Sequence, residues 1–126
     1  MEFGQVHHIE YYVKDLTISN IFWDWFMKEL NYKKISQWDD GVSWEHSTGT
    51  YICFVQVESQ NLAIENDRQG SGLNHLAFQG ASINQLDEMQ KKLESKNIKV
   101  LKRNEGYLCF EDPNQFAVEI YAAESN

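Results

Sequence analysis

Apolar and polar residues alternate in short runs along much of the chain, and two longer stretches space their apolar residues as a helix does. The alternation over residues 5–13, rich in β-branched and aromatic side chains, predicts a strand. The next stretch predicts a helix over about 17–30, capped by Asp15 or Thr17. Trp23 lies off its expected apolar face, where it would meet another subunit or cover a sheet edge. That face comprises Leu16, Ile18, Ile21, Phe22, Trp25, Phe26 and Leu30.

Three strands are expected after this helix, at residues 32–38, 42–46 and 51–57. A tight turn at Asp39-Asp40-Gly41 joins the first two, because Asp-Gly tolerates the positive φ angles of such a turn. Polar residues dominate the next stretch, 59–72, which has the composition of a connection.

The second half repeats the same order of strand, helix and three strands. Its first strand is expected at 73–79, where His75 follows His8 by 67 residues. Ser82 is expected to cap the second helix, with Gln85 three residues later completing a capping box. The remaining strands are expected at 99–102, 107–110 and 116–121.

This repeat predicts an α+β fold of two βαβββ modules within one domain, residues 1–126. The modules are expected at about 1–58 and about 73–126, on either side of the connection 59–72.

An excess of acidic over basic residues limits the kinds of partner that the chain can bind. Its net charge is −8, with no basic cluster, so nucleic acid and anionic membranes would repel it. No apolar run reaches the ~20 residues that span a bilayer, and the N-terminus lacks the pattern of an export signal. We therefore expect a cytoplasmic protein in which Cys53 and Cys109 are reduced core thiols.

Three residues stand out as metal-ligand candidates: His8, His75 and Glu119. Each lies within an apolar strand run, where a buried ionisable side chain needs a partner. The histidines hold matching positions in the two modules, so their imidazoles could converge with the carboxylate as a facial triad. The alternative is that each side chain faces water or satisfies a local hydrogen bond.

Other candidates are secondary to these three. Gln56 is a candidate fourth ligand if its strand register turns it toward the site. Asn74 or Glu10 could hold the ligands in position, and His7 should point to the opposite face from His8. No Ser-His-Asp arrangement, phosphate loop or CxxC pair is present, and the sequence names no catalytic base.

These residues resemble the vicinal oxygen chelate superfamily, which includes glyoxalase I, bleomycin-resistance proteins, extradiol dioxygenases and fosfomycin-resistance enzymes. The run His8 to Leu16 is similar to the family's first-strand motif, with a ligand His five residues before a Val and seven before an Asp. Leu73 to Phe78 resembles the start of its second module. The segment Asp112 to Ile120 resembles its closing turn and metal-binding Glu, with Gln115 in place of the usual Gly.

The resemblance implies two modules whose strands form a curved mixed sheet around a central cup, usually in a homodimer. It also implies one divalent metal ion (Mn, Fe, Ni or Zn) held by His8, His75 and Glu119. Bound there, the metal acts as a Lewis acid on a small oxygen-chelating or electrophilic metabolite, in a lyase, isomerase, transferase or dioxygenase reaction.

Two alternatives remain open. One is a dimer like the bleomycin-resistance proteins, which sequesters a ligand without chemistry. The other is a structural or regulatory dimer with a vestigial site. The chain has no clear glutamate at the fourth ligand position of glyoxalase I, which counts against that activity.

Overall fold

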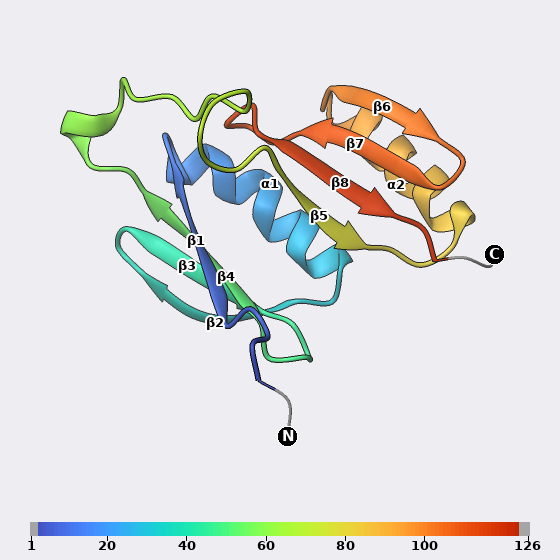
Figure 1. Ribbon diagram of the computed structural model, residues 1–126, viewed down its shortest axis with the longest axis horizontal. Helices are drawn as coiled ribbons and strands as arrows, with labels where there is room; N and C mark the ends of the chain where they lie inside the picture. Colours follow the sequence, from blue (N-terminus) through green and yellow to red (C-terminus); the bar gives the residue numbers. More distant parts are fainter. Residues whose placement is uncertain (1–2, 124–126) are drawn as a thin grey trace. The chain divides into compact units, whose positions relative to one another are not determined.

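The computed structural model describes residues 3–123 and divides into two compact units, Met1–Ile64 and Glu65–Asn126 (Figure 1). In each unit, one strand is followed by one helix and then by three further strands. The four strands of a unit form one mixed sheet. The predicted pair of βαβββ modules is confirmed.

Unit 1 (Met1–Ile64) orders its strands β1-β4-β3-β2. The first and last strands, β1 and β4, pair in parallel, and the other neighbours are antiparallel. A short 3₁₀ helix, Ser59–Asn61, follows β4. The elements are β1 His8–Val13, α1 Leu16–Glu29, β2 Lys33–Trp38, β3 Gly41–Glu45 and β4 Tyr51–Gln56.

Unit 2 (Glu65–Asn126) repeats this topology with the strand order β5-β8-β7-β6, again with a parallel pair between its first and last strands. Its helix starts 67 residues after that of unit 1, the same offset that separates His75 from His8. The elements are β5 His75–Gln79, α2 Ile83–Ser95, β6 Val100–Asn104, β7 Tyr107–Glu111 and β8 Ala117–Tyr121.

The repeat extends to an irregularity in the sheets. The β2–β3 register shifts between Lys34 and Ser36, and the β6–β7 register shifts between Val100 and Lys102. Each shift leaves one extra residue, Ile35 or Leu101, on the strand at the edge of its sheet. Such a bulge bends the strand and increases its twist.

Helix α1 begins where the sequence predicts but buries a different face. Asp15 caps it, because its Oδ1 accepts a hydrogen bond from the Ile18 amide at 3.1 Å. Trp23 is fully buried, with its ring centroid 4.5 Å from that of Phe54 on β4, whereas Ile21 is 75% exposed. The prediction that Trp23 lies off the core-facing stripe is therefore wrong. The buried residues of α1 are Ser19, Phe22, Trp23, Phe26 and Met27.

Helix α2 packs as predicted, with Leu86, Met89 and Leu93 buried. Its N-terminus carries a variant of the capping box. The Ser82 hydroxyl accepts a hydrogen bond from the Gln85 amide at 3.2 Å. The Gln85 side chain accepts from the amide of Ala81, one residue before the position that a standard capping box uses.

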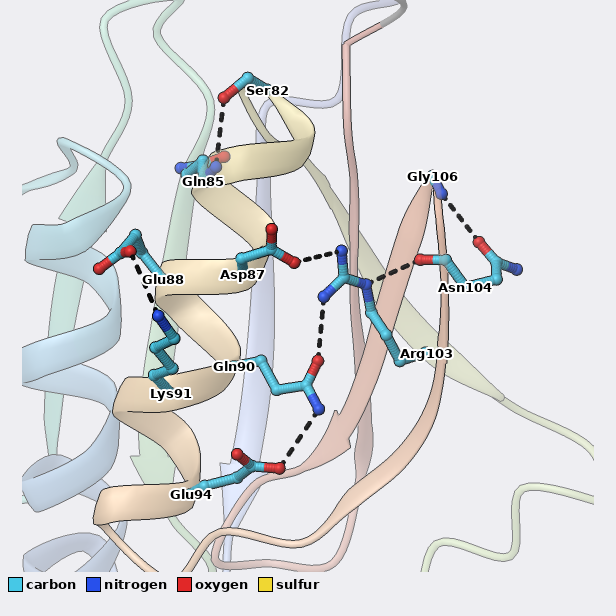
Figure 2. A network of polar contacts seen from close by, with 10 residues as sticks. All are labelled: Ser82, Gln85, Asp87, Glu88, Gln90, Lys91, Glu94, Arg103, Asn104 and Gly106. Carbon is cyan, nitrogen blue, oxygen red and sulfur yellow. Dashed lines mark hydrogen bonds and ion pairs between the residues drawn. The ribbon is translucent and has the colours of Figure 1, made fainter. Parts of the chain in front are cut away.

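A polar network joins α2 to β6 (Figure 2). At its centre, Arg103 Nη2 lies 2.9 Å from Asp87 Oδ1, and Arg103 Nη1 donates to Gln90 Oε1 at 2.9 Å. Arg103 Nε donates to its neighbour's carbonyl, Asn104 O, at 2.7 Å. The planar guanidinium therefore fixes the helix against the edge strand of its own sheet.

Cys53 and Cys109 are free and buried. None of the helices within residues 3–123 is both long and apolar enough to cross a membrane.

The burial of Trp23 gives a test of the α1 packing. Trp23→Ala removes a fully buried ring that stacks on Phe54, and such truncations cost roughly 3–5 kcal/mol. We expect a loss of this size in the free energy of unfolding, measured by urea denaturation. The matched control on the same helix is Ile21→Ala, at an exposed position, which should change stability by less than about 0.5 kcal/mol. Equal losses in the two variants would contradict the observed helix orientation.

Candidate functional site

The sheet of unit 2 has two unlike faces. Helix α2 packs on β6 and β7, and the side chains of Phe78, Leu108 and Ile120 are buried. Alternate residues on the same strands point to the other face, which carries most of the ionisable groups. We call this the open face of unit 2. It comprises His75, Ala77, Gln79, Lys102, Asn104, Tyr107, Cys109, Glu111, Ala117, Glu119 and Tyr121.

The register of the parallel pair brings His75 and Glu119 together on this face. His75 is opposite Ala117, and Glu119 is opposite Ala77, so the two side chains are diagonal neighbours on β5 and β8. His75 Nε2 lies 3.3 Å from Glu119 Oε1. The imidazole is 37% exposed and the carboxylate 12%, so a ligand can reach the pair from solvent.

Asn74 fixes which nitrogen of His75 carries a proton. The Asn74 amide nitrogen donates to Arg68 O at 2.8 Å, which directs its carbonyl oxygen toward His75 Nδ1, also at 2.8 Å. Because a carbonyl oxygen can only accept, Nδ1 must be the donor. In neutral His75 the lone pair on Nε2 therefore faces the Glu119 carboxylate. Two acceptors at this distance need a proton or a metal ion between them.

Two tyrosines lie near the carboxylate of this pair, and one of them is hydrogen-bonded to it. Tyr121 Oη donates to Glu119 Oε1 at 2.9 Å, and its ring stacks on Tyr107 with centroids 5.2 Å apart. The hydrogen bond to Glu119 raises the pKa of Tyr121, so the phenol remains a donor at neutral pH. Burial, with the nearby charge of Glu119, raises the pKa of the Cys109 thiol and makes it a poor nucleophile.

A buried aspartate positions the start of β8. Asp112 Oδ1 accepts hydrogen bonds from the amides of Asn114 and Phe116, both at 2.8 Å. Gln115, at the position where the resemblance leads us to expect glycine, takes a φ of 61°. The turn therefore keeps the conformation that glycine would favour, and β8 enters the sheet in the register that presents Glu119.

In unit 1, His8 lies on β1, at the edge of its own sheet. Its ring stacks on Tyr51 with centroids 4.7 Å apart, and its Nδ1 lies 2.9 Å from His7 Nδ1. Glu10 makes a hydrogen bond with Tyr12 that raises the pKa of that phenol.

Gln56, the candidate fourth ligand, makes structural contacts within unit 1. Its Oε1 accepts from the Leu16 amide at 2.9 Å, and its Nε2 donates to Lys14 O at 2.7 Å. The side chain thereby ties the end of β4 to the start of α1. These contacts favour a structural role over metal binding.

Across residues 3–123, no group of three or more His, Cys, Asp and Glu side chains has the arrangement of a metal site. His75 and Glu119 are brought together as a pair, and the participation of His8 in the same site stays a prediction.

Comparisons with known proteins place the chain in a family. No protein-family model matches it. An uncharacterised protein of Bacillus subtilis (strain 168), YqjT, is 42% identical over 126 residues, which cover 93% of this chain and 98% of that protein. A crystallised protein of Bacillus halodurans, described as a proposed glyoxalase, is 37% identical and has a TM-score of 0.90, with 95% of this chain and 96% of that chain covered. The chain belongs to the vicinal oxygen chelate superfamily.

More distant superfamily structures share the fold. A glyoxalase/bleomycin resistance/dioxygenase domain from Frankia is 22% identical with a TM-score of 0.74, covering 99% of this chain and 96% of that one. The fosfomycin resistance protein FosX of Listeria monocytogenes, crystallised with Mn(II) and sulfate, is 21% identical with a TM-score of 0.71, covering 97% and 92%.

For this superfamily member, the ladders identify a residue that sequence reasoning missed. Glu119 lies between Ala77 and Cys109 in its sheet, and Cys53 lies between Glu10 and Ser43 in the other. Cys53 therefore holds in unit 1 the place that Glu119 holds in unit 2, with its sulfur 3.1 Å from Ser43 Oγ. An offset of 66 residues between the last strands of the modules was the signal for this correspondence.

Replacing Gln56 tests its structural role. Gln56→Ala removes two hydrogen bonds between β4 and the start of α1 and leaves the Leu16 amide unpaired. We expect a loss of about 1–3 kcal/mol in the free energy of unfolding, with metal affinity unchanged. Gln37→Ala, on the exposed strand β2, is the control and should change neither quantity. A selective loss of metal affinity in Gln56→Ala would instead support the fourth-ligand prediction.

The hydrogen bond from Tyr121 to Glu119 gives a spectroscopic test of the site. Glu119→Gln removes the negative charge that favours the protonated phenol, so the pKa of Tyr121 should fall toward its ordinary value. Ultraviolet titration of phenolate absorbance, with Tyr121→Phe subtracted to isolate the signal, measures this shift. An unchanged pKa of Tyr121 would show that the two side chains do not interact in solution.

Proposed function

We propose that His75 and Glu119 hold a divalent metal ion, with His8 as the third ligand. One observation carries this proposal: His75 Nε2, the nitrogen that has no proton in the neutral imidazole, lies 3.3 Å from a carboxylate oxygen. Two ligand atoms each about 2.1 Å from the same metal, in neighbouring coordination positions, are separated by roughly 3.0–3.4 Å. The pair therefore fits a shared metal ion.

The surrounding residues support the same assignment. Asn74 keeps the proton on Nδ1, so the lone pair of Nε2 is available to bind a metal ion. This is the usual arrangement for a ligating histidine. The pair consists of one imidazole and one carboxylate, which suits manganese, iron, nickel or zinc. The Mn(II) bound to the FosX relative makes manganese the first of these to test.

We further infer that the protein is an enzyme acting on a small oxygen-chelating or electrophilic metabolite. A metal bound here supplies a Lewis acid that polarises a substrate oxygen. The chain's own residues then have defined tasks. His75 and Glu119 hold the metal in place, Asn74 orients the imidazole, and the Tyr121 hydroxyl donates to Glu119.

As part of this proposal, the working assembly is a homodimer in the cytoplasm. His8 would then complete the ligand set either from the same chain or from a second copy. Mixing His8→Ala protein with His75→Ala protein distinguishes the two arrangements, because only shared sites recover metal binding in the mixed dimer.

Metal content is the direct test of the proposed function. Protein purified without chelator should carry about one divalent ion per chain by elemental analysis, and added Mn or Zn should raise its melting temperature by mass action. We expect His75→Ala and Glu119→Ala each to lower metal affinity by at least about 100-fold, because each removes a ligand. His8→Ala should do the same if it supplies the third ligand.

His46→Ala is the matched control, because the His46 imidazole hydrogen-bonds to Thr48 in the turn after β3 and has no role in the proposed metal site. Its metal affinity should equal that of the unmodified protein. Protein that carries no stoichiometric metal and gains no stability from Mn, Fe, Ni or Zn would overturn the proposal. Tight ligand binding by such metal-free protein would then favour the ligand-sequestering alternative.

A further inference from the structure

A row of mostly aromatic and apolar residues crosses the sheet of unit 1 beside the hairpin between β2 and β3. Trp38 on β2 pairs in register with Gly41, and Gly41 pairs with Val55 on β4. Val55 in turn pairs with Tyr12 on β1. Residues that pair on neighbouring strands point to the same face of a sheet, so these four positions form one continuous row. We call this row the aromatic strip.

The aromatic strip lies on the face of the sheet that α1 does not cover. Phe54 stacks on Trp23 of α1, so Val55, the next residue on the strand, points to the opposite face. A Cβ atom added to Gly41 would overlap the six-membered ring of Trp38, so the indole lies directly over this glycine. The absence of a side chain at this position therefore makes room for the indole.

The two aromatic side chains of the strip are exposed in large part. Trp38 is 46% exposed and Tyr12 is 52% exposed, and Val55 between them is half-buried. Apolar surface that gathers in one place on a soluble protein usually marks a binding site. Tryptophan and tyrosine are also the residues that most often anchor a bound partner or ligand.

The two modules differ at this row, so the fold alone does not require the strip. The positions of Gly41 and Val55 match those of Tyr107 and Tyr121 in unit 2, whose rings stack with centroids 5.2 Å apart. A polar residue, Asn104, stands in unit 2 where unit 1 has its exposed indole.

Carboxylates lie at both ends of the aromatic strip. Asp39 and Asp40 form the turn that directly follows Trp38. At the other end, Glu10 is hydrogen-bonded to Tyr12. None of these three carboxylates is in an ion pair within the described part of the chain. A positively charged ligand would be attracted to either end of the strip, whereas an anion would be repelled.

We propose that the aromatic strip binds an organic cation, with the positive group over the Trp38 indole and beside the Asp39-Asp40 turn. The face of an indole attracts a cation more strongly than that of any other side chain. The apolar part of the ligand would lie along Val55 toward Tyr12. The site is built from unit 1 alone and uses none of the proposed metal ligands, so it goes beyond the proposed function.

The experiment titrates ¹⁵N-labelled protein, as purified, with benzyltrimethylammonium and with the neutral benzyl alcohol. Nuclear magnetic resonance follows the indole N–H signal of Trp38, which is assigned by its loss in Trp38→Leu. The cation should shift this signal and bind more tightly than the alcohol. A rise in salt concentration should weaken binding of the cation and leave binding of the alcohol unchanged.

Variants separate the contributions of the ring and the charges, with binding followed through the backbone amides of the strip. Trp38→Leu should weaken binding of the cation about fivefold, and Trp38→Phe should restore part of the loss. The double variant Asp39→Asn, Asp40→Asn should weaken it about threefold. Glu105→Gln is the matched control, because Glu105 begins the corresponding turn of unit 2, between β6 and β7, and it should have no effect.

Equal affinity for the cation and the alcohol, or a Trp38 signal that the cation does not move, would overturn the proposal. Sedimentation velocity then identifies the other occupant of this surface. If Trp38→Leu converts a dimer to monomers while the cation has no effect, the aromatic strip is an interface with a second copy of the chain and the cation site is wrong. Because no metal ligand is altered, loss of the proposed metal site would not change these results.

Discussion

The parallel pairing of β5 with β8 is the constraint on which the candidate site depends. It joins residues more than forty positions apart in the sequence and sets His75 diagonally opposite Glu119. A shift of one residue in this ladder would turn one of the two side chains to the face that α2 covers. Two side chains support this arrangement. Asp112 fixes the turn from which β8 starts, and Asn74 orients the imidazole of His75.

The order of strands and helices could be predicted because the same pattern of apolar and polar residues occurs in both halves of the chain. Helix α2 was also oriented correctly, since its apolar residues are few and stand against charged neighbours. Helix α1 was not, because apolar residues surround it on nearly all sides and periodicity alone does not choose between Ile21 and Trp23. Packing against Phe54 decides the choice, and the sequence does not reveal which ring that tryptophan will meet.

The candidate site was predictable where its parts are close along the chain or match between modules. Asn74 is next to His75 in the sequence, and its side-chain oxygen lies 2.8 Å from His75 Nδ1. Gln56 was a candidate ligand only if the strand register turned it toward the site, and the strand places it on the helix side, bound to backbone groups. In unit 1, Cys53 occupies the position that corresponds to Glu119. This correspondence becomes visible only when the residues paired with each of the two on the neighbouring strands are compared.

The bulges at Ile35 and Leu101 have a consequence for how copies of this chain can associate. An ordinary edge strand displays a regular row of unpaired amides and carbonyls, which a strand from another molecule can extend. In β2 and β6 that row is interrupted and bent by one additional residue. Growth of a continuous intermolecular sheet from these two edges is therefore disfavoured, and the chain is protected there against the strand-by-strand stacking that leads to fibrils.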